Sequence, residues 1–319
     1  MVASLSNWFG EWVFSGGGWT RLVLLLGLVI GLLPGCSVRQ LAINKAGDAL
    51  ASSGIVFAAD DDPELIRDAA PFSLKLMESL LAESPRHRGL LYATSSGFTR
   101  YAYAFVHQDA DRLEDQDLKA ASEQRSRAQR MYRRARDYGL RGLDVAHPEF
   151  SRKLRLDPKS AARIARKDDV PLLYWTAVSW AALISLSKHD PDLVADVPVV
   201  EVLIDRAAVL DEAYDSGAIH NFLITFEMVR QGATGDPATR ARHHFDRAVS
   251  LTGGLQAGPY VSLAESVAVP RQDRSEFEAL LKQALAIKPG QRPEWRLANT
   301  VMQRRARWLL TQSDQLFAE

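Results

Sequence analysis

The sequence predicts an all-α protein in which helices pack side by side in pairs. Three observations support this prediction. Apolar residues recur at helical spacing in nearly every segment after residue 36. No segment shows the alternation of apolar and polar residues that a half-buried strand needs, and there is no Asn-Gly or Asp-Gly hairpin turn. Signals for the start and end of helices recur along the chain.

The start signals are aspartate–proline pairs. Aspartate caps free backbone amides, and the fixed φ of proline suits the first helical position. Glycines and a proline–glycine pair fall between the periodic runs and predict helix ends. The predicted starts are Asp62-Pro63, Asp157-Pro158, Asp190-Pro191 and Asp236-Pro237, and the predicted stops are Gly139, Gly232, Gly253 and Pro289-Gly290.

Several of the predicted helices carry small and large residues in turn on one stripe, at i, i+4 and i+7. Such a stripe lets a second helix approach closely. It is typical of the second helix of tetratricopeptide (TPR) repeats, although a plain helical bundle can show it as well. The intervals of 38 residues (203 to 241) and 36 residues (241 to 277) are near the TPR period of about 34. The stripes are Ala128/Tyr132/Ala135, Leu203/Ala207/Leu210, Ala241/Phe245/Ala248 and Phe277/Leu281/Ala284.

Residues 36–319 therefore form one predicted all-helical, TPR-like domain, with irregular insertions around 107–125 and 140–169. Residues 107–137 are acidic first and arginine-rich afterwards. They predict either a solvated helix with i,i+4 ion pairs or a docking surface for an acidic partner. In residues 140–169 we expect short helices that expose the basic side chains of Arg152, Lys153, Arg155, Arg163, Arg166 and Lys167.

The beginning of the chain is typical of an export signal. Arg21 precedes the apolar run 22–33, which is shorter than the roughly 20 residues that span a bilayer. Leu33-Pro34-Gly35-Cys36 resembles the lipobox of bacterial lipoproteins. This resemblance implies a signal peptide at 1–35, a lipid on Cys36 and anchoring in the periplasm, with Ser37 favouring the outer membrane. A short signal anchor with an incidental cysteine is the alternative.

The composition and motifs argue against several functions. Lys plus Arg equals Asp plus Glu at 39 each, so no global charge attracts nucleic acid. The chain contains no HExxH, GxxxxGK or GxSxG motif and has one cysteine, Cys36. His243 and His244 are adjacent and point in different directions on a helix, so they are poor co-ligands for a metal. We expect no catalytic site, no metal and no cofactor.

Apolar and aromatic residues are the remaining candidates for function. Residues 172–184 are apolar nearly all round, which predicts a helix that is buried on several sides or lines an apolar cavity. Each of these aromatic side chains can equally belong to an ordinary core, and the polar candidate can be a structural hydrogen-bonding group. The candidate ligand-binding residues are Tyr174, Trp175, Trp180, Phe222, Phe226, Tyr260 and Asn299.

Four stretches give the chain a resemblance to the TatT lipoprotein family, the T components associated with TRAP transporters. They are YRRARDYGL at 132–140, HFDRAVSLTGG at 244–254 with GPYVSLAE at 258–265, FEALLKQAL at 277–285, and RLANTVMQRRARWLL at 296–310. The resemblance implies a TPR-like lipoprotein that can form a homotrimer with apolar pores. It also implies a partner, the periplasmic solute-binding receptor of a TRAP transporter, and a hydrophobic small molecule as ligand. A TPR scaffold for outer-membrane or cell-envelope assembly is the competing function.

Overall fold

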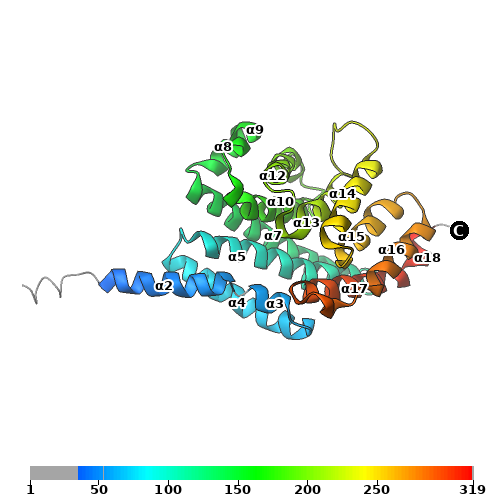
Figure 1. Cartoon of the computed structure of the whole chain (residues 1–319), viewed down its shortest axis with the longest axis horizontal. Coiled ribbons are helices and arrows are strands. Elements are labelled where there is room, and N and C mark those ends of the chain that lie inside the picture. The colour runs from blue at the N-terminus through cyan, green and yellow to red at the C-terminus, as the bar shows by residue number, and fades with distance from the viewer. Residues whose placement is uncertain (1–34, 53, 318–319) are drawn as a thin grey trace, which may run out of the picture. The chain divides into compact units, whose positions relative to one another are not determined.

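The computed structural model describes residues 35–52 and 54–317, and every regular element in these ranges is helical (Figure 1). The chain divides into two compact units, residues 1–43 and 44–319, and the fold below is that of the second unit. Its first half contains the end of α2 (Gly35–Ser52), then α3 (Gly54–Ala58), α4 (Pro63–Glu83), α5 (Arg88–Tyr101), the π-helix η1 (Ala102–His107), α6 (Gln108–Leu113), α7 (Leu118–Ala146), α8 (Phe150–Leu156), α9 (Pro158–Arg163) and η2 (Lys167–Asp169).

The second half is also helical. It comprises α10 (Val170–Ser185), α11 (Pro191–Val194), α12 (Val197–Leu210), α13 (Tyr214–Phe226), α14 (Pro237–Thr252), α15 (Ala257–Leu263), the π-helix η3 (Ala264–Ala268), α16 (Arg274–Ala286), η4 (Pro289–Gln291), η5 (Pro293–Trp295), α17 (Arg296–Thr311) and α18 (Ser313–Leu316). The all-α prediction is confirmed for the described residues. TPR-like stacking of these helices stays a prediction.

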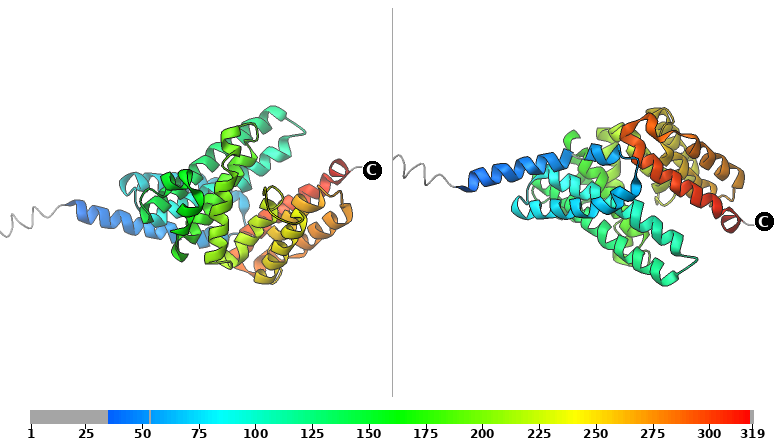
Figure 2. Two further views of the ribbon diagram at one scale, coloured as in Figure 1. Left: turned by 90° about the horizontal axis from the view of Figure 1, so that it is seen from above. Right: turned by 90° about the horizontal axis from the view of Figure 1, so that it is seen from below.

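The long helix α7 lies at the centre of the first half. It packs against α5 on one side and α10 on another, and α10 in turn packs against α12. The chain passes through α5, η1 and α6, turns at 114–117, and returns along them as α7. Residues 107–125 therefore form the end of a long hairpin. Figure 2 shows this end of the hairpin projecting past the neighbouring helices. Residues 140–169 form the end of α7 and the short elements α8, α9 and η2.

The predicted helix starts are confirmed by capping hydrogen bonds. Asp62, Asp157, Asp190 and Asp236 each accept a hydrogen bond from a backbone amide in the first turn of α4, α9, α11 and α14. Gly253 ends α14 in the left-handed conformation, with φ of 61°. These boundaries follow from local chemistry, because an aspartate oxygen satisfies amides that the helix leaves free.

The predicted stop at Gly139 is wrong, because this glycine lies inside α7. Its role is to let another helix approach. A Cβ atom at position 139 would lie 2.2 Å from Thr176 Oγ1 of α10 and 3.1 Å from Ser95 Oγ of α5. Gly142, one turn later, is in the same situation, since its Cβ would lie 2.6 Å from Leu172 Cδ2. Absence of side chains at these two positions sets the spacing of α5, α7 and α10.

The small–large stripes form the apolar interior. Two clusters of buried side chains contain most of their members, one around α5, α7, α10 and α12 and the other around α14, α15, α16 and α17. Tyr132 and Phe277, the large members of two stripes, are fully buried. The smaller members Ala128, Ala135, Ala241 and Ala284 are buried beside them.

An ion-paired joint connects the long hairpin to the C-terminal helices. The guanidinium of Arg305 in α17 donates to Asp111 Oδ2 of α6 at 2.6 Å and to Glu265 Oε1 of η3 at 2.6 Å. Burial disfavours the charge of Arg305, yet Glu265 and Asp111 outweigh burial and raise its pKa. A deeply placed arginine with two carboxylates thus holds three segments together.

The predicted signal peptide lies almost entirely outside the described residues. Residues 1–34 are not described, and for Cys36 and Ser37 only the helical backbone of α2 is described. No helix among residues 35–52 and 54–317 is both long and apolar enough to cross a membrane.

We predict that Gly139→Ala lowers the free energy of unfolding by about 1–3 kcal/mol, because the added methyl group forces α7 and α10 apart. Thr176 cannot simply turn away, since its hydroxyl donates to Leu172 O at 2.6 Å inside the core. Gly54→Ala is the control, because nothing lies within 4 Å of the Cβ at that position. Urea denaturation of both variants checks this, and equal stabilities would contradict the packing role of Gly139.

Candidate functional site

The outward side of α7 carries a row of arginines. Arg127, Arg130, Arg134 and Arg141 are exposed and lie within roughly 60° of one another around the helix axis, given 100° per residue. Arg133 is exposed next to this row. The buried stripe of α7 occupies the opposite side, so one helix supplies both core and charge. We call these five arginines the basic face of α7.

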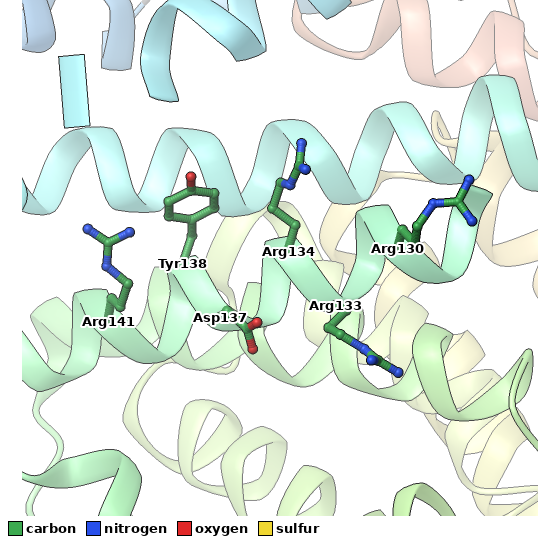
Figure 3. A pocket seen from close by; sticks show the side chains of 6 residues that line it. All are labelled: Arg130, Arg133, Arg134, Asp137, Tyr138 and Arg141. Carbon is green, nitrogen blue, oxygen red and sulfur yellow. The ribbon is translucent and has the colours of Figure 1, made fainter. Parts of the chain in front are cut away.

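A shallow hollow of about 350 Å³ lies on the basic face. It is lined by Arg130, Arg133, Arg134, Asp137, Tyr138 and Arg141 (Figure 3). In Figure 3, Arg130, Arg134, Tyr138 and Arg141 point to one side of α7, while Arg133 and Asp137 point away from it. Four of its six lining residues are arginines, and Asp137 contributes one negative charge.

Part of the basic face is tied to the neighbouring helices. Arg134 Nε lies 3.5 Å from Glu78 Oε1 of α4, and its guanidinium lies 5.2 Å from the ring of Phe98 in α5. Tyr138 donates its hydroxyl to Glu78 at 2.9 Å, and burial together with this bond raises the pKa of Tyr138 to about 12. Arg141 donates to Pro85 O at 3.2 Å. These contacts fix the floor of the hollow.

The remaining arginines of the basic face have no such ties. Within the described residues, Arg127, Arg130 and Arg133 make no hydrogen bond or ion pair with their side chains. Guanidinium groups bind carboxylates and phosphates through two parallel hydrogen bonds. Unpaired arginines around a rigid hollow can therefore bind an acidic group of a partner.

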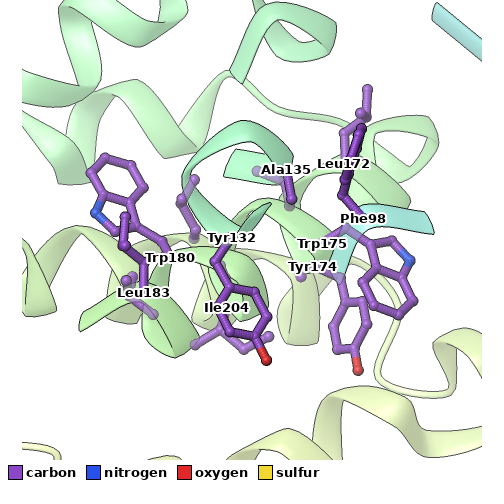
Figure 4. Close-up of a cluster of buried hydrophobic side chains, with 14 of the residues drawn as sticks. Phe98, Tyr132, Ala135, Leu172, Tyr174, Trp175, Trp180, Leu183 and Ile204 are labelled. Atoms are coloured by element: carbon purple, nitrogen blue, oxygen red, sulfur yellow. The ribbon is translucent and has the colours of Figure 1, made fainter. Parts of the chain in front are cut away.

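Three of the predicted ligand-binding residues, Tyr174, Trp175 and Trp180, lie on α10 and are buried in the first core cluster (Figure 4). Trp180 donates its Nε1–H to Asp196 Oδ2 at 3.1 Å. Trp175 Nε1, by contrast, is buried and has no hydrogen-bond partner. The guanidinium of Arg100 lies over the Trp175 ring, 4.6 Å from its centroid, and the Arg100 side chain is half exposed.

The other four predicted residues lie elsewhere. Phe222 and Phe226 stack on each other in α13 with their centroids 5.4 Å apart, and Tyr260 packs against Phe245 at 5.3 Å. Asn299 is buried, and its amide accepts from Ala257 N at 2.8 Å and donates to Leu255 O at 2.9 Å. The structure therefore places Tyr174, Trp175, Trp180, Phe222 and Phe226 in or against the first core cluster, with Tyr174 and Trp175 in direct ring contact, and leaves Tyr260 and Asn299 outside it.

A strained segment beside Trp175 was not found from the sequence. Asp215, Ser216 and Gly217 all have left-handed backbones, with φ of 45°, 55° and 92°. Tyr214, which precedes them, packs 5.4 Å from the ring of Tyr174, and Asp215 lies 3.6 Å from Arg100. Non-glycine residues with positive φ are uncommon and gather at functional sites. The one feature of the sequence that could have indicated this segment is its composition, since Asp, Ser and Gly are common in turns.

Of the adjacent histidines His243 and His244, His244 pairs with a third histidine, His220, and not with its neighbour. His244 Nδ1 lies 2.9 Å from His220 Nδ1 across α13 and α14, so one ring donates to the other. In the part of the chain that the structure describes, no group of three or more His, Cys, Asp or Glu side chains could hold a metal. Burial, with the neighbouring His220, lowers the pKa of His244 to about 4.

Comparison with known proteins identifies the class of protein to which the chain belongs, a component associated with a transporter. The model of the TRAP transporter T-component family matches residues 59–317, and the chain belongs to this family. The resemblance found in the sequence is thereby confirmed. The chain is also 29% identical, over 308 residues, to an uncharacterized protein of Treponema pallidum (strain Nichols). This match covers 90% of the chain and 95% of that protein.

We predict that the histidine pair makes the protein less stable in acid. The folded pKa of His244, about 4, lies below the ordinary value of 6.5. The unfolded chain therefore takes up a proton first as the pH falls. The contribution of His244 to the free energy of unfolding is complete above pH 6.5. It falls by about 1.4 kcal/mol per pH unit between 6.5 and about 4.

Urea denaturation of the parent and of His244→Gln across this pH range measures the effect. The variant should lose most of the extra pH dependence. His189→Gln, which changes an exposed histidine, should retain it. An identical slope in the parent and His244→Gln would exclude the pair as its cause.

Proposed function

We propose that this chain is a lipid-anchored periplasmic protein that binds the solute-binding receptor of a TRAP transporter and handles a hydrophobic small molecule without catalysing a reaction. Membership of the T-component family supports the link to the transporter. In this proposal Cys36 carries the lipid, Ser37 favours the outer membrane, and a TPR-like homotrimer is the assembly.

The unpaired arginines of the basic face are the observation on which receptor binding rests. Three of its five arginines are not neutralised by the chain itself, although the chain as a whole has no net charge. A cationic surface that is not paired internally increases the rate of encounter with an acidic surface and selects the orientation of docking. The receptor surface that binds here is accordingly acidic.

We predict that Arg130→Glu combined with Arg133→Glu weakens receptor binding by roughly tenfold or more, chiefly through slower association at low salt. Two single variants test whether the position of the reversed charge matters: Arg127→Glu lies on the basic face and Arg307→Glu lies outside it. Arg307 is an exposed arginine of α17, outside the basic face, and its reversal should leave affinity unchanged. Reversal of Arg127 should weaken binding.

Surface plasmon resonance with the purified solute-binding receptor of the TRAP transporter measures these affinities at two salt concentrations. Equal losses for Arg307→Glu and for the double variant would refute the basic face as the docking site. Recovery of outer-membrane or cell-wall assembly proteins in place of a receptor, in pull-downs from membranes, would favour the competing envelope scaffold.

The unpaired indole of Trp175 supports contact with a ligand. A buried donor without a partner costs about 1–3 kcal/mol, which a bound acceptor can recover. Arg100 covers this ring from a half-exposed position, and the strained backbone at 215–217 lies alongside. We propose that movement of Arg100 admits a mostly apolar molecule that contacts Tyr174 and Trp175. Trp180, Phe222, Phe226, Tyr260 and Asn299 remain candidates of lower rank, since each is occupied by contacts within the protein.

We predict that Trp175→Phe retains the fold but lowers the amount of co-purified apolar ligand several-fold, because the indole donor is removed while the ring remains. Trp295→Phe is a matched control, since Trp295 is also buried and covered by an arginine, with Arg292 4.7 Å from its ring. Native mass spectrometry of protein from membranes gives the bound mass. Full retention of ligand by Trp175→Phe would exclude this position.

A further inference from the structure

The short helices α8 and α9 concentrate positive charge. Residues 149–168 contain seven Lys or Arg and three Asp or Glu, so their net charge is +4 in a chain whose total is zero. All seven basic side chains are exposed. They are Arg152, Lys153, Arg155, Lys159, Arg163, Arg166 and Lys167. We refer to residues 149–168 as the basic hairpin.

The basic hairpin is firmly attached to the rest of the fold. Phe150, Leu154, Ala161 and Ala162 are buried beneath it. Arg206 of α12 donates to the carbonyl oxygens of Arg163 at 3.1 Å and Ala165 at 2.6 Å, which satisfies the end of α9. The exposed side chains of the hairpin are therefore presented from a fixed backbone.

Two apolar side chains stand exposed among these charges. Leu156, at the end of α8, is 75% exposed, and Ile164, just after α9, is 40% exposed. Both line a surface hollow of about 190 Å³, together with Lys153, Asp157, Ser160 and Ala161. Exposed aliphatic side chains surrounded by Lys and Arg are typical of helices that lie at the surface of an anionic bilayer.

The acidic residues of the hairpin leave most of this charge uncompensated. Glu149 pairs with Arg152 at 2.8 Å, and Asp157 is used as the cap of α9, accepting from Ser160 N at 3.1 Å. Lys167 pairs with Asp211 Oδ2 at 3.5 Å. Arg155, Lys159 and Arg163 make no side-chain hydrogen bond or ion pair in the described part of the chain, although Arg155 and Arg163 interact electrostatically with Asp196 and Asp157. Their flexible side chains can reach phosphates whose positions vary, as they do in a fluid membrane.

We propose that the basic hairpin binds the surface of a membrane containing anionic phospholipid, with Leu156 and Ile164 entering the headgroup layer and the basic side chains contacting lipid phosphates. A protein partner fits less well, because the centre of a protein interface is enriched in aromatic residues and the hairpin exposes none. This contact is separate from receptor docking on α7. It orients the protein on a membrane, whether or not Cys36 carries a lipid.

The test uses the full chain with Cys36→Ser, which removes its one cysteine and any lipid. Leu156→Cys then introduces a unique thiol for a polarity-sensitive fluorophore. Leu118→Cys is the control, because Leu118 is 67% exposed at the start of α7, outside the hairpin. Vesicles of phosphatidylcholine, with and without phosphatidylglycerol, are the probes.

We expect a blue shift of the fluorophore at position 156 with vesicles that contain phosphatidylglycerol, and little shift with phosphatidylcholine alone. Position 118 should not respond. Adding Arg155→Glu and Lys159→Glu should lower vesicle affinity by roughly tenfold or more, since each charge near an anionic surface contributes to binding. Flotation of unlabelled Leu156→Ser checks the same loss without a label.

Three results would overturn the proposal: no shift at position 156, equal shifts at positions 156 and 118, or the same shift with soluble polyglutamate in the absence of lipid. The last would identify the hairpin as a site for acidic protein segments. Receptor affinity of the Leu156 variants should equal that of the parent, so failure of this proposal and failure of receptor docking are distinguishable.

Discussion

The close approach of α5 and α10 to α7 is the constraint on which the other features depend. Gly139 and Gly142 leave no Cβ atoms at the point of contact, and Thr176 and Leu172 of α10 occupy the vacated space. The opposite side of α7 remains largely exposed to solvent. The basic face follows from this division, because its arginines take exposed positions of α7.

The parts of the fold that depend on local chemistry could be predicted from the sequence. Aspartate–proline pairs capped the helices where expected, and the stripe of Ala128, Tyr132 and Ala135 is buried. Gly139 could not be interpreted correctly, because a glycine that ends a helix and a glycine that admits a neighbouring helix look alike in one sequence. The left-handed residues 215–217 could not be predicted either, because packing imposes a backbone conformation that is locally unfavourable for non-glycine residues.

The sequence predicted which kinds of residue form the candidate site, arginines and aromatic residues, but not how these residues are arranged in space. The arginine-rich segment was recognised with two interpretations, a solvated helix with ion pairs and a docking surface for an acidic partner, and the docking surface stays a prediction. Some of its charges are paired, but through residues distant in sequence, such as Glu78 with Arg134. Pairing across helices cannot be deduced from i,i+4 spacing. The aromatic candidates were selected by composition, and composition cannot tell a filled core from a ligand contact. Among these aromatic candidates, all of which lie in the described part of the chain, Trp175 is the one with a buried polar atom that lacks a hydrogen-bond partner.

Because the chain has no net charge, carboxylates elsewhere must balance its two basic surfaces, and exposed ones such as Asp115 and Asp117 at the turn before α7 supply part of that balance. Ion pairs inside the fold do not, since they use equal numbers of carboxylates and arginines. Asp111 and Glu265 bind Arg305, while Glu227 binds Arg240 Nε at 2.6 Å and Arg230 at 3.1 Å. Each of these pairs joins segments distant in sequence or closes the end of a helix pair. The asymmetry arises from where the exposed charges lie. Asp115 and Asp117 are exposed at the turn before α7, while the arginines of the basic face are exposed along its outward side and those of residues 149–168 on the basic hairpin. Both proposed interactions use this separation of charge in the sequence, which the ion pairs inside the fold leave unchanged.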